Sequence, residues 1–362
     1  MKKVILFILC FSFILNLKAQ EDSGTSDSKS LSDQSLKATN FSVPNSLAFD
    51  LLEVSPSNIH RPGITRDFKS DWIFNNNGLN PNIAFEAEPI WLLFHRKTSF
   101  MEFEDKRNKY LRKTLSSLNL SVGTVTKDST QSLAYGLKIN LFTEKHPMFD
   151  NDLILDITPK MTKIDTLLRD IEIDIDNAKT KIEFDSLSQI KDSIEVVKEK
   201  ESASFNDFVI NRLEVFEKEN WNSTVIDLGF GQILNYDSEK LDSLNLTNKG
   251  FAFWLAGVTG IGKKVMLNGI IKYSVFDEFK RIEPGGNIRY GSLKVNGFVE
   301  LLYQYTDFNE MENTKNIILA YGVDYKASNG FYIQASLKTK YDEDFKVRNL
   351  IPTISFNYQL SQ

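Results

Sequence analysis

Three histidines, His60, His95 and His146, are the residues of this chain best suited to proton transfer or metal binding. None has a second histidine or a cysteine at metal-ligand spacing, so the sequence predicts no metal site and no cofactor. A barrel enzyme of the outer membrane would need a Ser or Asp beside His95 or His146, which fall near strand ends. A histidine in that position is more often a solvated side chain, so we expect no catalytic residue.

A second set of chemically active side chains is charged and falls on the polar faces of alternating segments. In a barrel these side chains would point into the lumen, where they either pair and fill it or line a pore that selects solutes. About twelve strands leave both outcomes open, since eight strands give a filled barrel and sixteen leave a channel. The predicted lumen-lining residues are Glu86, Glu88, Lys138, Lys272, Arg289, Lys294, Glu300, Asp324 and Lys338.

The elements that must position these charges are segments with a period-two alternation, which begin at Ile83. In one of them, Val299 and Leu301 share an apolar face and Glu300 lies on the opposite face. The runs are about 10 to 13 residues long, as in tilted membrane strands and unlike the shorter strands of soluble domains. Aromatic residues recur near their ends, as in interfacial girdles. The sequence therefore predicts a mostly β fold, a transmembrane antiparallel β-barrel with an inserted α-helical hairpin.

The strand number and the orientation follow from counting. The recognisable runs are odd in number and bacterial barrels usually have even numbers, so we expect about twelve strands and one missed strand, near 70–75 or 99–104. Short turns, such as 327–330, alternate with longer charged loops, such as 276–284. Because short turns face the periplasm in outer-membrane barrels, this parity predicts a periplasmic C-terminus and a periplasmic helical insert.

The N-terminus predicts export. Lys2 and Lys3 precede an apolar run from Val4 to Leu15, and Ala19 supplies the small residue before a cleavage site. We expect a signal peptide over 1–19 and an outer-membrane location. Cys10 is the only cysteine and lies in this peptide, so the exported chain is expected to lack disulfides. The 43 basic residues fall to 40 without Lys2, Lys3 and Lys18, against 48 acidic ones, so no nucleic-acid partner is expected.

The remaining chain is divided by composition. Residues 20–40 are rich in Ser and Asp and predict a disordered leader. Residues 41–81 contain several prolines and predict a periplasmic or plug-like segment before a barrel over 82–362. Within that segment, a lumen plug, a contact with the periplasmic rim and a plain linker all remain open for 45–66.

A helical insert is predicted within the barrel over 158–220. The chain has neither Gly nor Pro between Lys160 and Leu228, and its apolar residues follow a three-four spacing. The spacing predicts a hairpin of helices over roughly 160–199 and 203–219. The two apolar stripes either pack on each other or bind a partner protein, in which case Leu168, Ile171 and Ile175 form the partner surface.

Two other partner classes are expected. The strands' apolar faces predict contact with outer-membrane lipid. A recurrent Asp-Ser or Asp-Thr pattern resembles an O-glycosylation signal of exported Bacteroidota proteins, although Asp-Ser pairs on a solvated helix face are the simpler explanation. The candidate glycan acceptors are Ser129, Thr166, Ser186, Ser193 and Ser243.

Two segments carry a family resemblance. Asn45 to Ser57 with Arg61-Pro62, and the hairpin from Asn287 to Tyr305, resemble uncharacterised, porin-like outer-membrane β-barrel proteins of Bacteroidota. The resemblance implies the barrel and no functional residue. We therefore expect a narrow porin-like channel or a structural, partner-docking subunit and no enzyme. The alternatives are a periplasmic or secreted β-rich binding protein with a helical arm, and a barrel enzyme.

Overall fold

The computed structural model describes the barrel and leaves other parts of the chain undescribed. The described residues are 46–62, 68–74, 82–94, 114–127, 130–145, 214–236, 246–328 and 330–360, with isolated residues between 170 and 212. The predicted signal peptide (1–19) and leader (20–40) lie outside them, as do His95 and His146. The same holds for Leu168, Ile171 and Ile175, and for Ser129, Thr166, Ser193 and Ser243; Ser186 is described and exposed.

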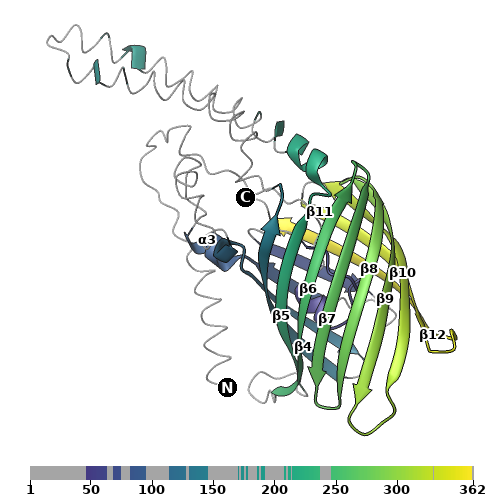
Figure 1. Cartoon of the computed structure of the whole chain (residues 1–362). Helices are drawn as coiled ribbons and strands as arrows, with labels where there is room; N and C mark the ends of the chain where they lie inside the picture. The colour runs from purple at the N-terminus through teal and green to yellow at the C-terminus, as the bar shows by residue number, and fades with distance from the viewer. Residues whose placement is uncertain are drawn as a thin grey trace. The chain divides into compact units, whose positions relative to one another are not determined.

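Twelve antiparallel strands close into a barrel. Figure 1 shows this barrel from the side. Each strand pairs with the next along the chain, and β1 pairs with β12, so that Ser70 lies opposite Tyr358. Closure leaves no unpaired strand edge. The strands are β1 (Phe68–Phe74), β2 (Asn82–Ala87), β3 (Asn119–Lys127), β4 (Thr130–Thr143), β5 (Val225–Tyr236), β6 (Leu246–Ile261), β7 (Val265–Phe276), β8 (Phe279–Gly291), β9 (Val295–Phe308), β10 (Thr314–Ser328), β11 (Phe331–Tyr341) and β12 (Val347–Leu360).

The alternation in sequence becomes an apolar outside and a polar inside. On β9, Val299 and Leu301 are more than half exposed, at 57% and 56%, whereas Glu300 between them is fully buried. Successive side chains of a strand point to opposite faces, so this pattern places Glu300 inside the barrel. The predicted mostly β fold and the strand estimate of about twelve are confirmed.

The structure corrects several predicted boundaries. The missed strand is β1, one of the two predicted places, so the barrel begins at Phe68 and not at residue 82. The run from Ile83 does not continue as a strand through Leu93, because α3 (Pro89–Phe94) follows β2. Pro89 has no N–H for a strand ladder and favours the first turn of a helix. The loop predicted at 276–284 is wrong, since β8 already begins at Phe279.

The connection that carries the insert lies at the barrel end where the C-terminal strand finishes. Because strands alternate in direction, the β4–β5 connection is at the same end as the end of β12. Residues 214–220 of that connection are helical, and Phe216 and Trp221 are buried. The rest of the hairpin predicted over 158–220 lies almost wholly outside the described residues. Among the described helices, none is long and apolar enough to cross a membrane.

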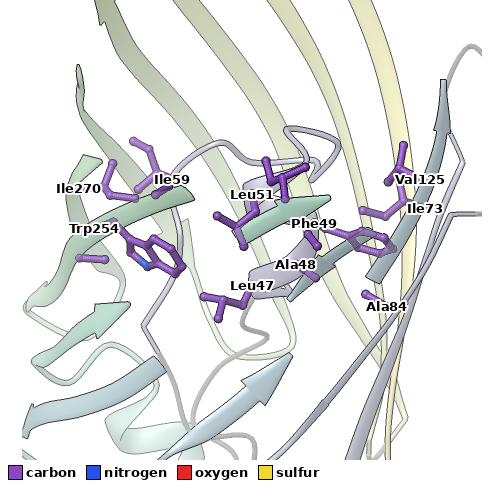
Figure 2. Packing of buried hydrophobic residues seen from close by; sticks show 14 of the residues in the cluster. Leu47, Ala48, Phe49, Leu51, Ile59, Ile73, Ala84, Val125, Trp254 and Ile270 are labelled. Atoms are coloured by element: carbon purple, nitrogen blue, oxygen red, sulfur yellow. The ribbon is translucent and has the colours of Figure 1, made fainter. Parts of the chain in front are cut away.

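The main apolar cluster lies inside the barrel. It is built around α2 (Leu47–Leu51), from which Leu47, Phe49 and Leu51 are buried, and around Ile59. Figure 2 shows these side chains together with Trp254 of β6. Much of the predicted plug-like segment therefore belongs to the interior of the barrel.

Candidate functional site: the occupied lumen

Residues 46–62, which we call the lumen plug, enter and leave the barrel at the same end. Leu47 contacts β2 near the C-terminal end of the barrel, through Glu86. The chain turns at Glu53, whose φ of 60° is a left-handed conformation, and Glu53 pairs with Arg281 near the start of β8 at the opposite end. It then returns, so that Arg61 reaches Asp324 of β10. The plug therefore spans much of the lumen twice.

Glycines in the wall allow α2 to lie against the strands. A Cβ atom on Gly136 of β4 would lie 2.5 Å from Cδ2 of Leu47, and one on Gly231 of β5 would overlap Leu51. A Cβ on Gly123 of β3 would lie 2.8 Å from the Cβ of Ala48. These approaches are too close for any larger residue, so the wall is shaped to this short helix.

We expect Gly123→Val to loosen the plug. The added atoms meet the Cβ atoms of Ala48 and Ala84, neither of which can rotate away, and such overpacking costs about 1–3 kcal/mol. The measurement is the midpoint of urea unfolding of the folded barrel together with conductance in planar bilayers. Gly257→Val is the matched control, because the nearest atoms to its Cβ are 3.9 Å away. Equal effects of both substitutions would contradict the close approach of α2.

Wall carboxylates bind main-chain N–H groups of the plug. Oε1 of Glu86 accepts a hydrogen bond of 2.6 Å from the N–H of Leu47, at the start of α2 where helical N–H groups lack internal partners. Oε1 of Glu300 accepts one of 2.7 Å from the N–H of Asn58, and its Oε2 accepts one of 2.5 Å from the hydroxyl of Ser57. Both carboxylates are buried, so charge-assisted bonds of this kind are strong.

Donors on β11 bind carbonyl groups of the plug. Nζ of Lys338 donates to the carbonyl of Ser55 at 2.7 Å, and the hydroxyl of Ser336 donates to the carbonyl of Pro56 at 2.7 Å. Together with the contacts of Glu86 and Glu300, these bonds satisfy polar main-chain groups of an irregular segment away from water. These four wall residues thus hold the plug through polar contacts on three strands, β2, β9 and β11.

A buried histidine joins the two arms of the plug to the wall. Nδ1 of His60 lies 2.7 Å from Asp50 of the same plug, and its Nε2 lies 3.9 Å from Asp227 of β5. Lys138 of β4 lies 3.7 Å from the same Asp227. The His60 ring therefore lies between a carboxylate of the plug and a carboxylate of the wall.

Further ion pairs cover the inner wall. Lys69 of β1 lies 3.0 Å from Asp71 and 3.2 Å from Glu86. Lys272 of β7 lies 2.9 Å from Glu283 of β8. Removing one partner of such a buried pair leaves an uncompensated charge, which typically costs about 3–5 kcal/mol. Paired charges therefore cover parts of the inner wall around the plug.

The predicted lumen residues fall in three groups. Most lie on inward faces of strands: Glu86, Lys138, Arg289, Glu300, Asp324 and Lys338 are buried, and the side chain of Lys272 is 12% exposed. Glu88 is buried too, but it follows β2 and its carbonyl begins α3. Lys294 is a correction, because it lies in the turn between β8 and β9 and is exposed. The side chain of Lys294 was predicted to point inward from the alternation of a strand, and that alternation does not continue through a turn between two strands.

Other charged residues of the lumen were not predicted. Lys69 and Asp71 belong to β1, whose seven residues are too few for a clear alternation. Glu283 lies where the sequence predicted a loop. The sequence pattern could have placed Asp227 and His60 in the lumen. Asp227 lies on the polar face of β5, and His60 lies in the segment predicted to be plug-like. Their mutual contact joins residues far apart in the chain and leaves no local pattern.

One small cavity lies between the plug and the wall. A cavity of about 20 Å³ lies between Asp50, Glu53 and Ser55 of the plug and Lys272, Glu283 and Gln304 of the wall. This is room for about one water molecule. No group of three potential metal ligands occurs among the described residues.

These features define a class of protein, a membrane-spanning β-barrel with an occupied lumen. A closed barrel satisfies every strand edge internally, and its outward side chains are apolar, as a hydrocarbon environment requires.

Comparisons with known proteins give distant likenesses only. No family model matches the sequence, and no curated protein matches it. Among solved structures, the KdgM porin in complex with disordered oligogalacturonate has a TM-score of 0.36 and 9% identity, over 81% of this chain and 98% of the porin. The Acinetobacter baumannii outer membrane protein Omp33 has a TM-score of 0.33 and 6% identity, over 82% and 98%. The CymD monoaromatic hydrocarbon channel has a TM-score of 0.32 and 9% identity, over 82% and 90%.

Proposed function

We propose that this protein is an outer-membrane channel that is closed at rest and conducts when the lumen plug moves out of the barrel. The observation that carries the proposal is the plug itself, which crosses the lumen twice and leaves a cavity of about 20 Å³ beside it. The position of the plug therefore argues against a permanently open porin. The predicted signal peptide and the apolar exterior support the location.

The character of the contacts supports a movable plug. Glu86, Glu300 and Lys338 bind the plug through hydrogen bonds that water can replace once the segment leaves. The same three side chains would then line a polar pore of mixed charge, which needs no apolar surface to be exposed on the wall. The apolar side chains lost to water on opening are mainly those of α2 and Ile59.

The position of the plug's ends also supports movement. Both ends lie at the same end of the barrel, so the segment can withdraw without threading through the lumen. At the far end, the contact of the turn with the wall includes the ion pair of Glu53 with Arg281, in which the Glu53 side chain is 46% exposed. The Arg281 side chain is 13% exposed, so water reaches this contact mainly from the Glu53 side.

A disulfide that locks the plug tests this function. Oγ of Ser46 in the plug lies 3.2 Å from Oγ of Ser121 on β3, so the pair Ser46→Cys and Ser121→Cys is close enough for a disulfide. We expect the oxidised double variant to show no channel openings in planar bilayers, and a reducing agent to restore them. The native chain has one cysteine, Cys10, inside the predicted signal peptide, so the exported protein gives no background.

The single variants are the matched controls for the lock. Ser46→Cys and Ser121→Cys alone should conduct like the native chain with or without reducing agent, since neither can form the bond. Equal conductance of the oxidised and reduced double variant, with the bond verified by mass, would contradict plug withdrawal as the opening step.

A second candidate function, docking of a partner protein, has one observation in its favour. The two longest connections between paired strands, 88–118 and 144–224, both lie at the C-terminal end of the barrel. A barrel that served only as a structural subunit would present this end to a partner and would stay closed in bilayers after reduction of the lock. The lock experiment therefore separates the two candidates.

A further inference from the structure

Two buried arginines share one carboxylate near the C-terminal end of the lumen. Arg61 ends the lumen plug, Arg289 lies on β8, and both are almost fully buried at 2% and 0% exposure. Nη1 of Arg61 lies 3.5 Å from Oδ2 of Asp324, and Nη1 of Arg289 pairs with the same oxygen. Among the described residues, Asp324 is the only carboxylate paired with either guanidinium.

Each guanidinium also has one edge without a partner. Nε and Nη2 of Arg61, and Nε and Nη2 of Arg289, are buried and have no hydrogen-bond acceptor within the described part of the chain. Nε and Nη2 form the edge of a guanidinium that binds both oxygens of a carboxylate or phosphate group side by side. The remaining contacts of Arg289 do not involve this edge, since its Nη1 donates to Asn296 at 3.1 Å and its plane lies over the ring of Phe298.

The local charges of the described residues do not balance. The nearby Lys326 is paired with Glu217 at 3.2 Å, which leaves two guanidinium groups facing one carboxylate. The guanidinium group of Arg61 carries a positive charge at neutral pH, as arginine does in proteins generally. A buried positive charge in excess is unfavourable unless an anion compensates it.

We propose that Arg61 and Arg289 form a binding site for a small oxyanion, a phosphate or carboxylate group, inside the barrel. The ligand's oxygens would accept hydrogen bonds from the unpartnered Nε and Nη2 groups of both arginines, and its charge would offset the excess. Because Arg61 belongs to the plug and Arg289 to the wall, the bound oxyanion also joins the two. The site does not depend on whether the plug opens a channel.

Phosphate binding to the purified full-length chain tests the site. The folded protein in detergent is titrated with inorganic phosphate at constant ionic strength, with chloride as the balancing anion, and heat release is measured. We expect saturable binding to one site in the native chain. Each charge-assisted bond to the ligand is strong, so Arg289→Gln should weaken binding by at least about tenfold.

Two further variants and a second anion allow the test to be interpreted if one variant fails to fold. Arg61→Lys keeps the charge but loses the two-donor edge, and should also weaken binding by about tenfold or more. Arg348→Gln removes an arginine whose side chain is 66% exposed and should bind like the native chain. A parallel titration with acetate separates the two ligand sources: stronger acetate binding assigns a carboxylate, and stronger phosphate binding assigns a phosphate.

Two results would overturn the proposal. One is the absence of saturable binding of either anion to the folded native chain. The unpartnered Nε and Nη2 groups of the two arginines would then contact only water. The other is unchanged binding in folded Arg61→Lys and Arg289→Gln. Neither result bears on the disulfide lock, which measures conductance, so failure of this site and failure of the proposed channel are distinguishable.

Discussion

Replacing residues 46–62 by a Gly/Ser sequence of the same length is expected to turn the closed barrel into a steadily conducting pore. The replacement removes the side chains of α2 and the partners of Glu86 and Glu300, while a Gly/Ser chain has no fixed structure to occupy the lumen. In a barrel of eight strands the inward side chains fill the interior, whereas sixteen strands leave a wide channel. A barrel of twelve strands is intermediate in width. We therefore expect a narrow pore with a mean conductance at least about tenfold above that of the native chain.

The measurement is single-channel recording in planar bilayers, with faster migration of the unheated protein in gels as the check on folding. Glu343→Gln is a control, because Glu343 lies outside the lumen and its side chain is 53% exposed. A replaced chain that folds and stays closed would mean that wall side chains alone fill the lumen. The barrel would then be a structural subunit and not a channel.

Leu301→Arg is expected to destabilise the barrel strongly. Leu301 lies near the middle of β9, faces outward and is 56% exposed in the isolated chain. If that face contacts lipid, an arginine there must be buried in hydrocarbon at a cost of about 2–4 kcal/mol near the bilayer midplane. Reversible unfolding by urea in lipid vesicles measures the loss.

The matched control for the lipid face is Met311→Arg. Met311 is even more exposed, at 63%, but it lies in the loop between β9 and β10, beyond the ends of both strands. The same substitution there should change the unfolding free energy by about 0–1 kcal/mol. Equal stability of the two variants would argue that the apolar exterior faces water or protein instead of lipid.

The alternation of apolar and polar residues carried most of the fold prediction. On β9, β10 and β12 it places the correct residues outside, because each strand is long enough for several repeats of outward apolar residues. It failed at Lys294 and at α3, where a turn and a proline end the strand geometry. The sequence of α3 resembles a continued strand, because apolar residues also fill this helix from Ile90 to Phe94.

The interior of the site was only partly predictable. Glu86, Glu300, Asp324 and Lys338 were correctly placed on polar faces, but their partners could not be read from spacing. Ser57 and Glu300 are separated by 243 residues, and Ser336 and Pro56 by 280. Such contacts depend on how the barrel closes and on which segment enters it, and neither is a property of a short sequence window.

The sequence by itself determined most of the strands, their two faces and the polar character of the interior, because each follows from a period of two residues along the chain. Only the tertiary structure decided that β1 closes the barrel against β12 and that residues 46–62 occupy the lumen. The physical reason is that an irregular polar segment has no periodic signature. It enters the barrel because glycines leave room and buried wall charges satisfy its main chain, and those partners come together only when all twelve strands are paired.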